Sequence, residues 1–396
     1  MHICYFASYD SPYGGSARTL VFSRELVKLG HQVTIITSSY NHLMSKDTKP
    51  LNGNLYKDEI IDGVRIISVY GFNYKAHDQT ILRLIHMFQY SFLALIMAVV
   101  KLRRVDVILG TTVPLFSGLL AWLLSKIKRS RFYIEIRDVW PEELIDLGSI
   151  KRGSLIAKIL RSMEKFLYKN SIKIISALPN TKEHVYKSGS NSEIIYLPNP
   201  HDSDLQHQEY SGGKQNELEI MYLGGSGRAM RINTLIEAFM ELDLDGINLN
   251  IIGPVDFVEN YFNKSNRKRP HNIKTQGFVD RSELPVLFRN IDILVHPGNN
   301  TDQLKFGLNS NKILDYLASG RIVVLAARVD NDPVSDSGAG FKIEPENPSL
   351  MAELFRKIYY MSPETRKDIG KKGPSYLDKN FSASDLASML STKIEA

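Results

Sequence analysis

Short apolar segments rich in β-branched residues alternate with segments of helical periodicity over almost the whole chain of 396 residues. The first helical segment, residues 18–29, follows a strand-like segment and stops at Gly30. Such an alternation predicts a parallel sheet with helices on both faces. In the first 200 residues it predicts strands at 2–7, 33–37, 64–69, 105–109, 131–136, 172–176 and 193–197.

The alternation stops once and then resumes, which indicates two domains. Residues 198–202 contain two prolines, and the polar residues 203–217 resemble a linker. New strands are predicted at 219–223, 249–252, 273–276, 291–296 and 322–326, and helices at 232–242 and 282–289. We predict an α/β fold of two doubly wound Rossmann-like domains that face a cleft. The predicted parts are an N-terminal domain at 1–202, a linker at 203–217, a C-terminal domain at 218–375 and a helix at 376–396 that could pack back on the N-terminal domain.

Residues 309–325 predict a short helix followed by a buried strand. Asn309 or Ser310 can cap the helix with a side-chain oxygen, and Gly320 can end it in a left-handed conformation. Lys312 and Asp315 are three residues apart and share one helical face. The positive helix start suits a phosphate, and the carboxylate suits a ribose diol. The alternative is an ordinary helix–strand connection.

Each domain has a glycine-containing loop after its first strand. The first loop, residues 11–18, contains Gly14 and Gly15, and adjacent glycines let a backbone approach a ligand closely. The second loop, residues 222–231, adds arginines, whose planar donor fork matches phosphate oxygens. Its candidate donor-binding residues are Gly224, Gly225, Gly227, Arg228 and Arg231. Neither loop has the spacing of a dinucleotide fingerprint, which disfavours a nicotinamide dehydrogenase.

Charged residues and a tryptophan follow the predicted strand at 131–136. Arg137, Asp138 and Glu142 therefore lie where such a sheet places working residues, and they are the candidate catalytic residues. The alternative is structural, because Arg137 could simply pair with Asp138 or Glu142.

Several segments together resemble the family-4 nucleotide-sugar glycosyltransferases of the GT-B fold. They are residues 13–33, 197–202 and 311–324, and residues 137–143 resemble a bacterial branch of that family. This branch adds acetamido sugars to lipid-linked precursors of O-antigen, capsule and lipopolysaccharide. The resemblance implies transfer of a sugar, in particular an N-acetylated amino sugar, from a nucleoside diphosphate to a lipid-linked saccharide. It favours UDP over GDP as the nucleotide.

The resemblance also assigns roles to residues. Asp315 matches the acid that binds the ribose, the backbone near Val279 would border the base, and Gly14 and Gly15 would face the diphosphate. Backbone around Phe306, Gly307 and Leu308 would hold the donor sugar, and the helix start at Asn311 and Lys312 would complete the site. The chain departs from the family at Gly307, where many relatives have a glutamate, and at Gly225 and Met230, where they have Arg and Lys; Arg228 and Arg231 are the nearest substitutes.

The expected reaction retains the anomeric configuration and needs no metal and no cofactor, because no Asp-x-Asp in a metal-binding setting stands at the proposed site. Arg228, Arg231, Lys312 and the helix start would stabilise the leaving diphosphate. On a front-face route the departing phosphate takes the proton of the acceptor. If a general base is used, Asp138 and Glu142 are the candidates.

The N-terminal half is basic and predicts an anionic partner. Residues 1–200 carry 26 Lys and Arg against 16 Asp and Glu. Apolar runs at 91–100 and 113–124 are shorter than the ~20 residues of a spanning helix. We expect a cytoplasmic protein that is peripheral on the inner face of the bacterial plasma membrane, with an undecaprenyl-diphosphate-linked acceptor. Nucleic acid is disfavoured, because no zinc-finger or RNP-like motif is present. The lone Cys4 is expected in the core.

Two other functions fit parts of the sequence. A UDP-sugar epimerase also uses two such domains, although residues 137–143 fit it poorly. A non-catalytic nucleotide-sugar-binding protein is compatible with Gly307 in place of the family's glutamate. A sugar isomer, no turnover or a new glycosidic bond would distinguish these three readings.

Overall fold

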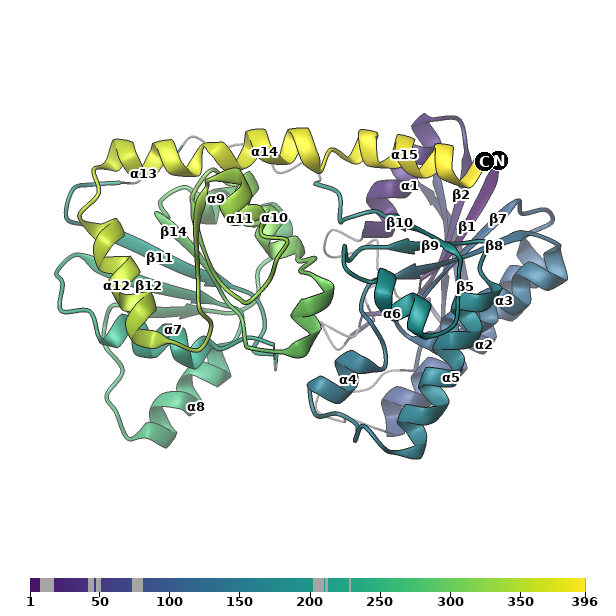
Figure 1. Ribbon diagram of the computed structural model, residues 1–396, viewed down its shortest axis with the longest axis horizontal. Helices are drawn as coiled ribbons and strands as arrows, with labels where there is room; N and C mark the ends of the chain where they lie inside the picture. Colours follow the sequence, from purple (N-terminus) through teal and green to yellow (C-terminus); the bar gives the residue numbers. More distant parts are fainter. Residues whose placement is uncertain are drawn as a thin grey trace. The chain divides into compact units, whose positions relative to one another are not determined.

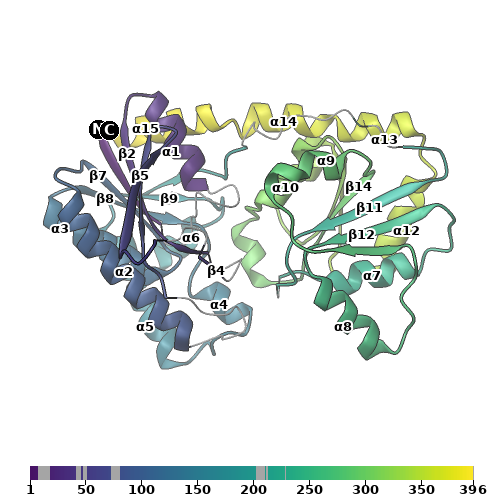
Figure 2. The same cartoon turned by 180° about the vertical axis from the view of Figure 1, so that it is seen from behind.

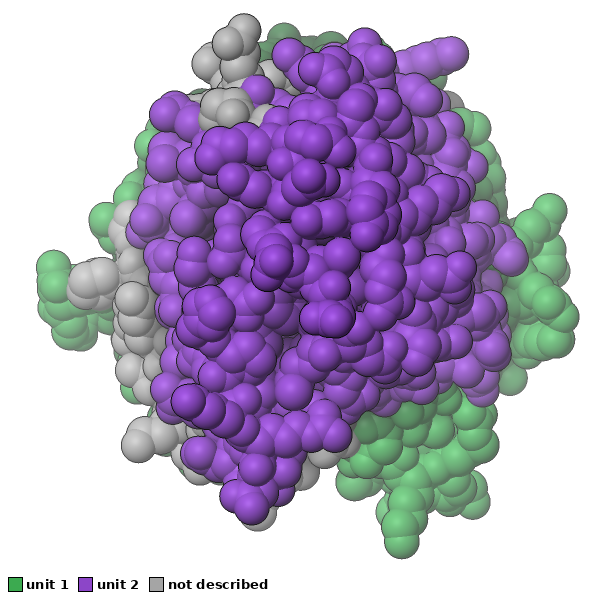
Figure 3. All heavy atoms as spheres, turned by 90° about the vertical axis from the view of Figure 1, so that its left-hand side faces the viewer, with its two compact units in different colours: residues 1–200, 383–396 green, residues 201–382 purple. Residues whose placement is uncertain are grey.

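A computed structural model shows two compact units (Figures 1 and 3). It describes residues 1–7, 18–41, 46–47, 51–72, 81–201, 210, 213–227 and 229–395. Unit 1 comprises Met1–Pro200 and Ala383–Ala396, and unit 2 comprises His201–Ser382. The chain therefore passes from unit 1 to unit 2 after Pro200 and returns after Ser382.

Unit 1 contains an eight-stranded sheet in the order β10-β9-β8-β7-β1-β2-β6-β5. All neighbours are parallel except β5 and β6. The strands are β1 (His2–Phe6), β2 (Gln32–Ser38), β5 (Tyr56–Ile61), β6 (Val64–Val69), β7 (Val107–Thr111), β8 (Arg131–Ile136), β9 (Lys173–Ser176) and β10 (Glu193–Tyr196); β3 (Tyr40–Asn41) and β4 (Lys46–Asp47) form a separate pair. Strand β5 has no counterpart among the predicted strands, because it is a largely polar edge strand that forms a hairpin with β6 through Asp62 and Gly63.

Helices cover both faces of this sheet. Helices α2 (Ile81–Lys101), α3 (Leu115–Lys128) and α5 (Leu155–Asn170) form one layer, in which α3 packs between the other two (Figure 2). Helix α1 (Arg18–Lys28) covers the other face together with α15 (Ala383–Glu395). The short helices α4 (Glu142–Asp146) and α6 (Lys182–Lys187) complete the unit.

The C-terminal helix α15 contributes to the core of unit 1. Its Ala387, Leu390 and Ile394 are buried in one cluster with residues of β1, β2 and α1. The His31 ring also forms a hydrogen bond with Ser391 Oγ at 2.7 Å. The last residues of the chain thus pack beside the first (Figure 1).

Unit 2 contains a six-stranded, wholly parallel sheet in the order β13-β12-β11-β14-β15-β16. The strands are β11 (Leu218–Leu223), β12 (Ile247–Ile252), β13 (Ile273–Gln276), β14 (Ile293–Pro297), β15 (Ile322–Ala326) and β16 (Gly340–Ile343). Helices α7 (Ile232–Met240), α8 (Val255–Ser265) and α12 (Pro348–Tyr359) pack on one face. The other face carries α9 (Leu284–Phe288), α10 (Asn311–Ala318), α11 (Pro333–Ser337) and α14 (Lys372–Asn380). The remaining helices are η1 (Arg281–Glu283), η2 (Asp302–Phe306) and α13 (Pro363–Gly370).

The described part of the expected linker packs on unit 2. Buried Arg366 of α13 donates hydrogen bonds to the carbonyls of Lys214 and Glu217, both at 2.9 Å, and pairs with Asp292 at 3.0 Å. Helix α14 also belongs to unit 2, because it packs on α10 and α11, so the chain returns to unit 1 later than residue 376. No helix in the described residues is long and apolar enough to cross a membrane.

Candidate functional site

The predicted donor-binding residues that the structure describes gather at the carboxyl edge of the sheet of unit 2. In a parallel sheet all strands end at the same edge, and ligands bind there. The loop with Gly224, Gly225 and Gly227 follows β11, and the loop with Val279 follows β13. Helix α10 begins at the same edge between β14 and β15. Gly14, Gly15 and Arg228 lie outside the described residues.

Helix α10 is attached to the end of β11 through one tyrosine. The hydroxyl of Tyr316 accepts a hydrogen bond from the N–H of Leu223 and donates one to its carbonyl. Gly320 ends the helix at a φ of 71°, as predicted. The predicted side-chain cap is wrong for Ser310, which occupies the N-cap position but accepts no hydrogen bond from the first turn.

Lys312 points from the first turn of α10 toward the glycine loop. Its Nζ lies 3.4 Å from the hydroxyl of Tyr222 and 5.2 Å from the centre of that ring. Burial lowers the pKa of the Lys312 ammonium to about 8. Among the described residues it forms no ion pair. A half-buried cation without a carboxylate partner is expected to attract an anion.

His296, at the end of β14, lies within reach of the charge of Lys312. Burial and, secondarily, that charge lower the pKa of the His296 ring to about 3, so the ring is neutral. Its Nδ1 is buried and has no hydrogen-bond partner in the described part of the chain. Buried polar atoms usually have a partner, so this site retains unused hydrogen-bonding capacity beside Lys312.

Two glycines allow the loops at this edge to approach one another. Gly224 has a φ of 139°, and a Cβ there would lie 2.0 Å from Lys312 Nζ. Gly253, after β12, has a φ of 115°, and a Cβ there would lie 2.4 Å from the Gly224 carbonyl oxygen. Both positions therefore require glycine.

Asp315 forms an ion pair with Arg281 of η1, at 2.7 Å. Side-chain exposures of 14% for Asp315 and 22% for Arg281 leave the pair partly accessible. The adjacent loop presents the ring of Phe278, which is 74% exposed and lies beside Gly225 and Gly253. An exposed aromatic ring next to a glycine loop offers a flat surface for a planar ligand.

The other predicted donor residues are engaged within unit 2. Arg231 is the N-cap residue of α7 and pairs with Glu346, so the expected phosphate ligand already has a carboxylate partner. The backbone of Leu308 is held by Asn331, whose side chain accepts from its N–H and donates to its carbonyl, both at 2.8 Å. The N–H of Gly307 donates to the Leu304 carbonyl. The N–H groups of Gly307 and Leu308 therefore already have acceptors within unit 2.

The backbone conformation at position 307 accounts for one difference from the family pattern, the glycine in place of a glutamate. Its φ of 110° lies in the left-handed region. A glutamate at this position would strain the backbone. Phe306, at the end of η2, is buried, and Asn311 at the start of α10 is exposed.

In unit 1 the residues after β8 form a charged cluster around Glu135. Its buried carboxylate accepts hydrogen bonds from Arg18 Nε at 2.8 Å and Arg137 Nε at 2.7 Å. Burial alone would raise the pKa of Glu135, but the two arginines outweigh it and lower the pKa to about 2. Arg18 also donates to the carbonyls of Leu197 and Pro198. The alternative pairing of Arg137 with Asp138 or Glu142 is thus replaced by a pairing with Glu135.

The two candidate bases have different surroundings. Glu142 accepts from Arg152 at 3.0 Å and from Arg161 at 2.8 Å, so it anchors α4 to the start of α5. Asp138 directly follows Arg137, and its side chain is exposed. The Glu142 carboxylate is therefore engaged by two arginines, whereas Asp138 forms no ion pair within the described residues.

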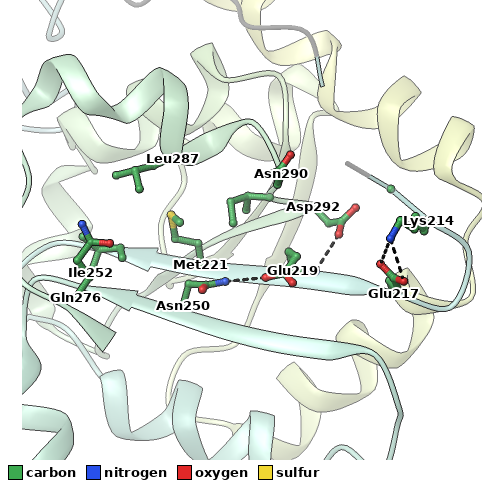
Figure 4. A pocket seen from close by; sticks show the side chains of 12 residues that line it. Lys214, Glu217, Glu219, Met221, Asn250, Ile252, Gln276, Leu287, Asn290 and Asp292 are labelled. Atoms are coloured by element: carbon green, nitrogen blue, oxygen red, sulfur yellow. Dashed lines mark hydrogen bonds and ion pairs between the residues drawn. The ribbon is translucent and has the colours of Figure 1, made fainter. Parts of the chain in front are cut away.

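Unit 2 also has a cavity of about 520 Å³ along β11 (Figure 4). It extends from Lys214 and Glu217 toward Ile252 and Gln276, and the Glu219 carboxylate inside accepts from Asn250 at 2.8 Å. Among the described residues that line it, none is a predicted donor ligand. One end of the cavity reaches Ile252 and Gln276, the last residues of β12 and β13, at the edge of the sheet where the predicted site lies.

Sequence reasoning assigned no individual role to six residues of this site, although two of them, Tyr222 and Phe278, lie in segments that it singled out. The six are Tyr222, Gly253, Phe278, Arg281, His296 and Tyr316. Tyr222 opens the predicted glycine loop, and Gly253 and Phe278 follow the ends of predicted strands, where ligand-binding loops begin. The other three residues had no local signal. In the described residues no group of three or more His, Cys, Asp or Glu could hold a metal ion.

Two family descriptions match the chain and together span most of it. Residues 14–200 match the Glycosyl transferase 4-like domain, and residues 206–376 match Glycosyl transferases group 1. The Probable glycosyltransferase WbjE of Pseudomonas aeruginosa is 20% identical over 299 residues, which are 71% of this chain and 72% of that protein.

Solved structures of similar fold cover the whole chain. Sucrose-phosphate synthase from Thermosynechococcus elongatus has a TM-score of 0.75 at 16% identity, covering 100% of this chain and 98% of that one. Anabaena HepE in complex with UDP-glucose has a TM-score of 0.68 at 11% identity, covering 100% of this chain and 99% of that one. With the two parallel-sheet units, these likenesses confirm the predicted fold class of two Rossmann-like domains, GT-B.

Proposed function

Since this chain is a glycosyltransferase built from a glycosyl transferase 4-like domain and a group 1 domain, we propose that it moves an N-acetylated amino sugar from UDP to a lipid-linked saccharide. The product would be a precursor of a surface polysaccharide, such as O-antigen, capsule or lipopolysaccharide. The name of the relative WbjE supports a sugar-transfer reaction. The likeness of residues 137–143 to the acetamido-sugar branch is the reason for the sugar and the acceptor.

One observation supports the donor site above all others: Lys312 is a half-buried cation without an ion-pair partner in the described residues. It lies at the positive start of α10, beside Gly224, which gives close access to a backbone. A diphosphate placed there would supply the missing counter-charge. Asp315, three residues further along the same helix, would accept hydrogen bonds from the ribose hydroxyls, and Arg281 would orient its carboxylate.

Phe278 would supply a stacking surface for the base. Its exposed ring adjoins the glycine loop, on the side of the β13 loop where the base is expected. UDP is the proposed nucleotide, because it is the nucleotide in the HepE complexes that share this fold. The neutral ring of His296 would donate or accept a hydrogen bond at the diphosphate or the sugar.

We propose a reaction that retains the anomeric configuration and requires no metal. Lys312 and the start of α10 would stabilise the charge that develops on the leaving diphosphate. The bond from the anomeric carbon to the phosphate oxygen breaks, and the acceptor oxygen bonds to that carbon from the same face. The departing phosphate takes the acceptor's proton, or else the carboxylate of Asp138 takes it as a general base. Transfer that continues in excess EDTA would support the metal-free route.

The decisive experiment is nucleotide release from a panel of UDP- and GDP-sugars, with and without bacterial membrane lipid extract. Lipid-dependent release of UDP from one acetamido sugar, with a new glycosidic bond in the lipid product, would support the proposal. Conversion of the free nucleotide sugar to an isomer would indicate an epimerase. Nucleotide binding without release from any sugar, with extract present, would indicate a binding protein.

A further inference from the structure

The outward face of α2 is apolar over four helical turns. Ile85, Phe88, Phe92, Ile96 and Val100 follow one another at spacings of three and four residues, and their exposures run from 41% to 65%. The opposite face, with Tyr90, Ala94 and Ala98, is fully buried. A helix on the surface of a globular protein normally presents polar residues outward. Helix α2 instead has apolar residues on both its buried and its exposed face.

The apolar surface continues over the neighbouring helices. Leu123 and Ile127 are exposed on α3, and Leu155, Ile156 and Ile159 are exposed on α5. The three helices lie side by side in one layer (Figures 1 and 2). Phe88 and Phe116 join α2 to α3 with ring centres 4.3 Å apart, and Trp122 and Phe166 join α3 to α5 at 4.7 Å. Contiguous apolar surface of this kind marks an interaction site.

The charges around this surface have one sign. Exposed Lys126, Lys158, Lys165 and Lys169 stand on α3 and α5. The sequences of α2, α3 and α5 contain a single acid, Glu164, which is buried and bonded to His184 and Tyr168. A second copy of the chain would bring these like charges together. An anionic lipid surface accepts both the apolar side chains and the lysines.

We propose that the outward face of α2, α3 and α5 docks on an anionic lipid bilayer, with the apolar ridge Ile85–Phe88–Phe92–Ile96–Val100 inserted among the lipids and the lysines at the headgroups. Other basic residues of the N-terminal half are engaged within the protein: Arg152 and Arg161 are paired with Glu142, and Lys128 donates to the carbonyls of Val99 and Leu102. The insertion of apolar side chains therefore carries more of the binding than charge alone.

The position of the layer formed by α2, α3 and α5 relates the docking surface to the expected acceptor site. Helices that follow parallel strands begin at the carboxyl edge of the sheet, so α3 and the first turns of α5 begin at the edge where Arg137 and Asp138 follow β8. A lipid-linked saccharide would emerge from the bilayer at this edge. That step rests on the proposed function, whereas the docking itself does not.

Co-sedimentation of the full chain with vesicles tests the surface. We compare vesicles of phosphatidylcholine alone with vesicles containing 30 mol% phosphatidylglycerol, at low and high salt. Wild type should bind the anionic vesicles, and Phe92→Gln/Val100→Gln should reduce the partition coefficient at least about tenfold. The matched control Ile60→Gln/Val286→Gln changes two equally exposed apolar residues elsewhere, at 73% and 62%, and should bind as wild type. Lys126→Gln/Lys158→Gln should lose about fivefold per charge and only on anionic vesicles.

The docking surface would be overturned if wild type bound neither kind of vesicle, or if wild type and Phe92→Gln/Val100→Gln bound equally well. It would also be overturned if wild type bound no vesicles but formed a dimer in light scattering that this variant dissociates. UDP binding by the same variants, measured without lipid, distinguishes a failure of the docking surface from a failure of the proposed function. Normal UDP binding with lost vesicle binding isolates the surface. Vesicle binding with no sugar transfer from any donor would overturn the proposed function and leave the surface intact.

Discussion

The hydroxyl of Tyr316 is bonded to both backbone groups of Leu223, at 3.0 Å from its nitrogen and 3.2 Å from its oxygen. One buried side chain of α10 thereby replaces a neighbouring strand at the end of β11. Lys312 lies one turn before Tyr316 on the same side of the helix. Together with the buried apolar residues of α10, this tyrosine therefore fixes the position of the ammonium against Gly224.

Tyr316→Phe should lower both stability and nucleotide affinity. It leaves the partly buried N–H of Leu223 without its partner, which costs about 1–3 kcal/mol in the free energy of unfolding, and it loosens the placement of Lys312. Urea denaturation and UDP titration measure the two effects. Tyr359→Phe is the matched control: it removes a hydroxyl that donates to the Asp245 carbonyl at 3.1 Å, so it should lose stability but not UDP affinity. Unchanged UDP affinity in Tyr316→Phe would contradict the positioning role.

Lys312→Met should stabilise the ligand-free protein and weaken UDP binding about 100-fold. The pKa of Lys312 is about 8 when folded and 10.5 ordinarily, so keeping it charged at pH 7 costs up to about 3 kcal/mol. Between pH 8 and 10.5 the unfolded chain binds the extra proton, and stability rises with pH. The advantage of Lys312→Met in urea denaturation should therefore shrink across that window. If Lys312→Met is less stable than wild type at pH 7, then burial of the charged Lys312 ammonium does not destabilise the folded protein, contrary to this prediction.

Asp315→Asn should remove ribose recognition. We expect the dissociation constant of UDP to rise about 10- to 100-fold, because a charged acceptor is lost. Wild type should prefer UDP to 2′-deoxy-UDP, and the variant should not distinguish the two. Arg281→Met, which removes only the ion-pair partner at 2.7 Å, should weaken UDP binding less. Equal discrimination of the two nucleotides by wild type and Asp315→Asn would exclude the ribose role.

Gly307→Glu should not improve the enzyme, although it restores the residue that many relatives have. The left-handed φ of 110° makes any side chain there costly, by about 1–2 kcal/mol. Thermal denaturation should show a lower midpoint, and nucleotide release should not rise. Gly153→Ala, where a Cβ meets no atom within 4 Å, serves as the neutral control. Faster release by Gly307→Glu would show that the loop can adopt the relatives' conformation.

Glu135→Gln should destabilise unit 1 by about 3–5 kcal/mol at pH 7, because it leaves the buried Arg18 and the partly buried Arg137 without their carboxylate. The folded pKa of about 2 lies below the ordinary 4.5. The stabilisation is therefore complete above pH 4.5 and is lost as the pH falls toward 2. Denaturation of both proteins from pH 7 to pH 3 should show the difference narrowing below pH 4.5. A difference independent of pH would mean that the charge of Glu135 contributes nothing.

Periodicity was sufficient for the sheet architecture, since most strands of both units are buried, β-branched and regularly spaced. It was also sufficient for α10, where Gly320 supplies a clear stop. Strand β5 lies at an edge of the sheet and contains the consecutive charged residues Lys57, Asp58 and Glu59, so its composition resembles that of a loop. Sequence proximity misled the pairing of Arg137, because alternation along β8 places Glu135 and Arg137 on the same face while Asp138 lies beyond the strand.

Which residues meet at the site could not be predicted from the sequence, because the contacts join residues that are far apart along the chain. Tyr222, His296 and Lys312 come from two strands and a helix, and nothing local to any of them shows that they meet. Phosphate-binding arginines were expected from charge alone, yet Arg231 is engaged by Glu346, more than a hundred residues away. Lys312 was identified because its signal was local: a helix start and a shared face with Asp315.

The return of α15 to unit 1 has a consequence for synthesis. Ala387, Leu390 and Ile394 complete the same buried cluster as Ile3 and Leu26. The half of the protein that leaves the ribosome first therefore lacks part of its core until α15 has been translated. A premature stop codon or a proteolytic cut near residue 383 would expose apolar surface on unit 1, which is built mainly from the opposite half of the chain.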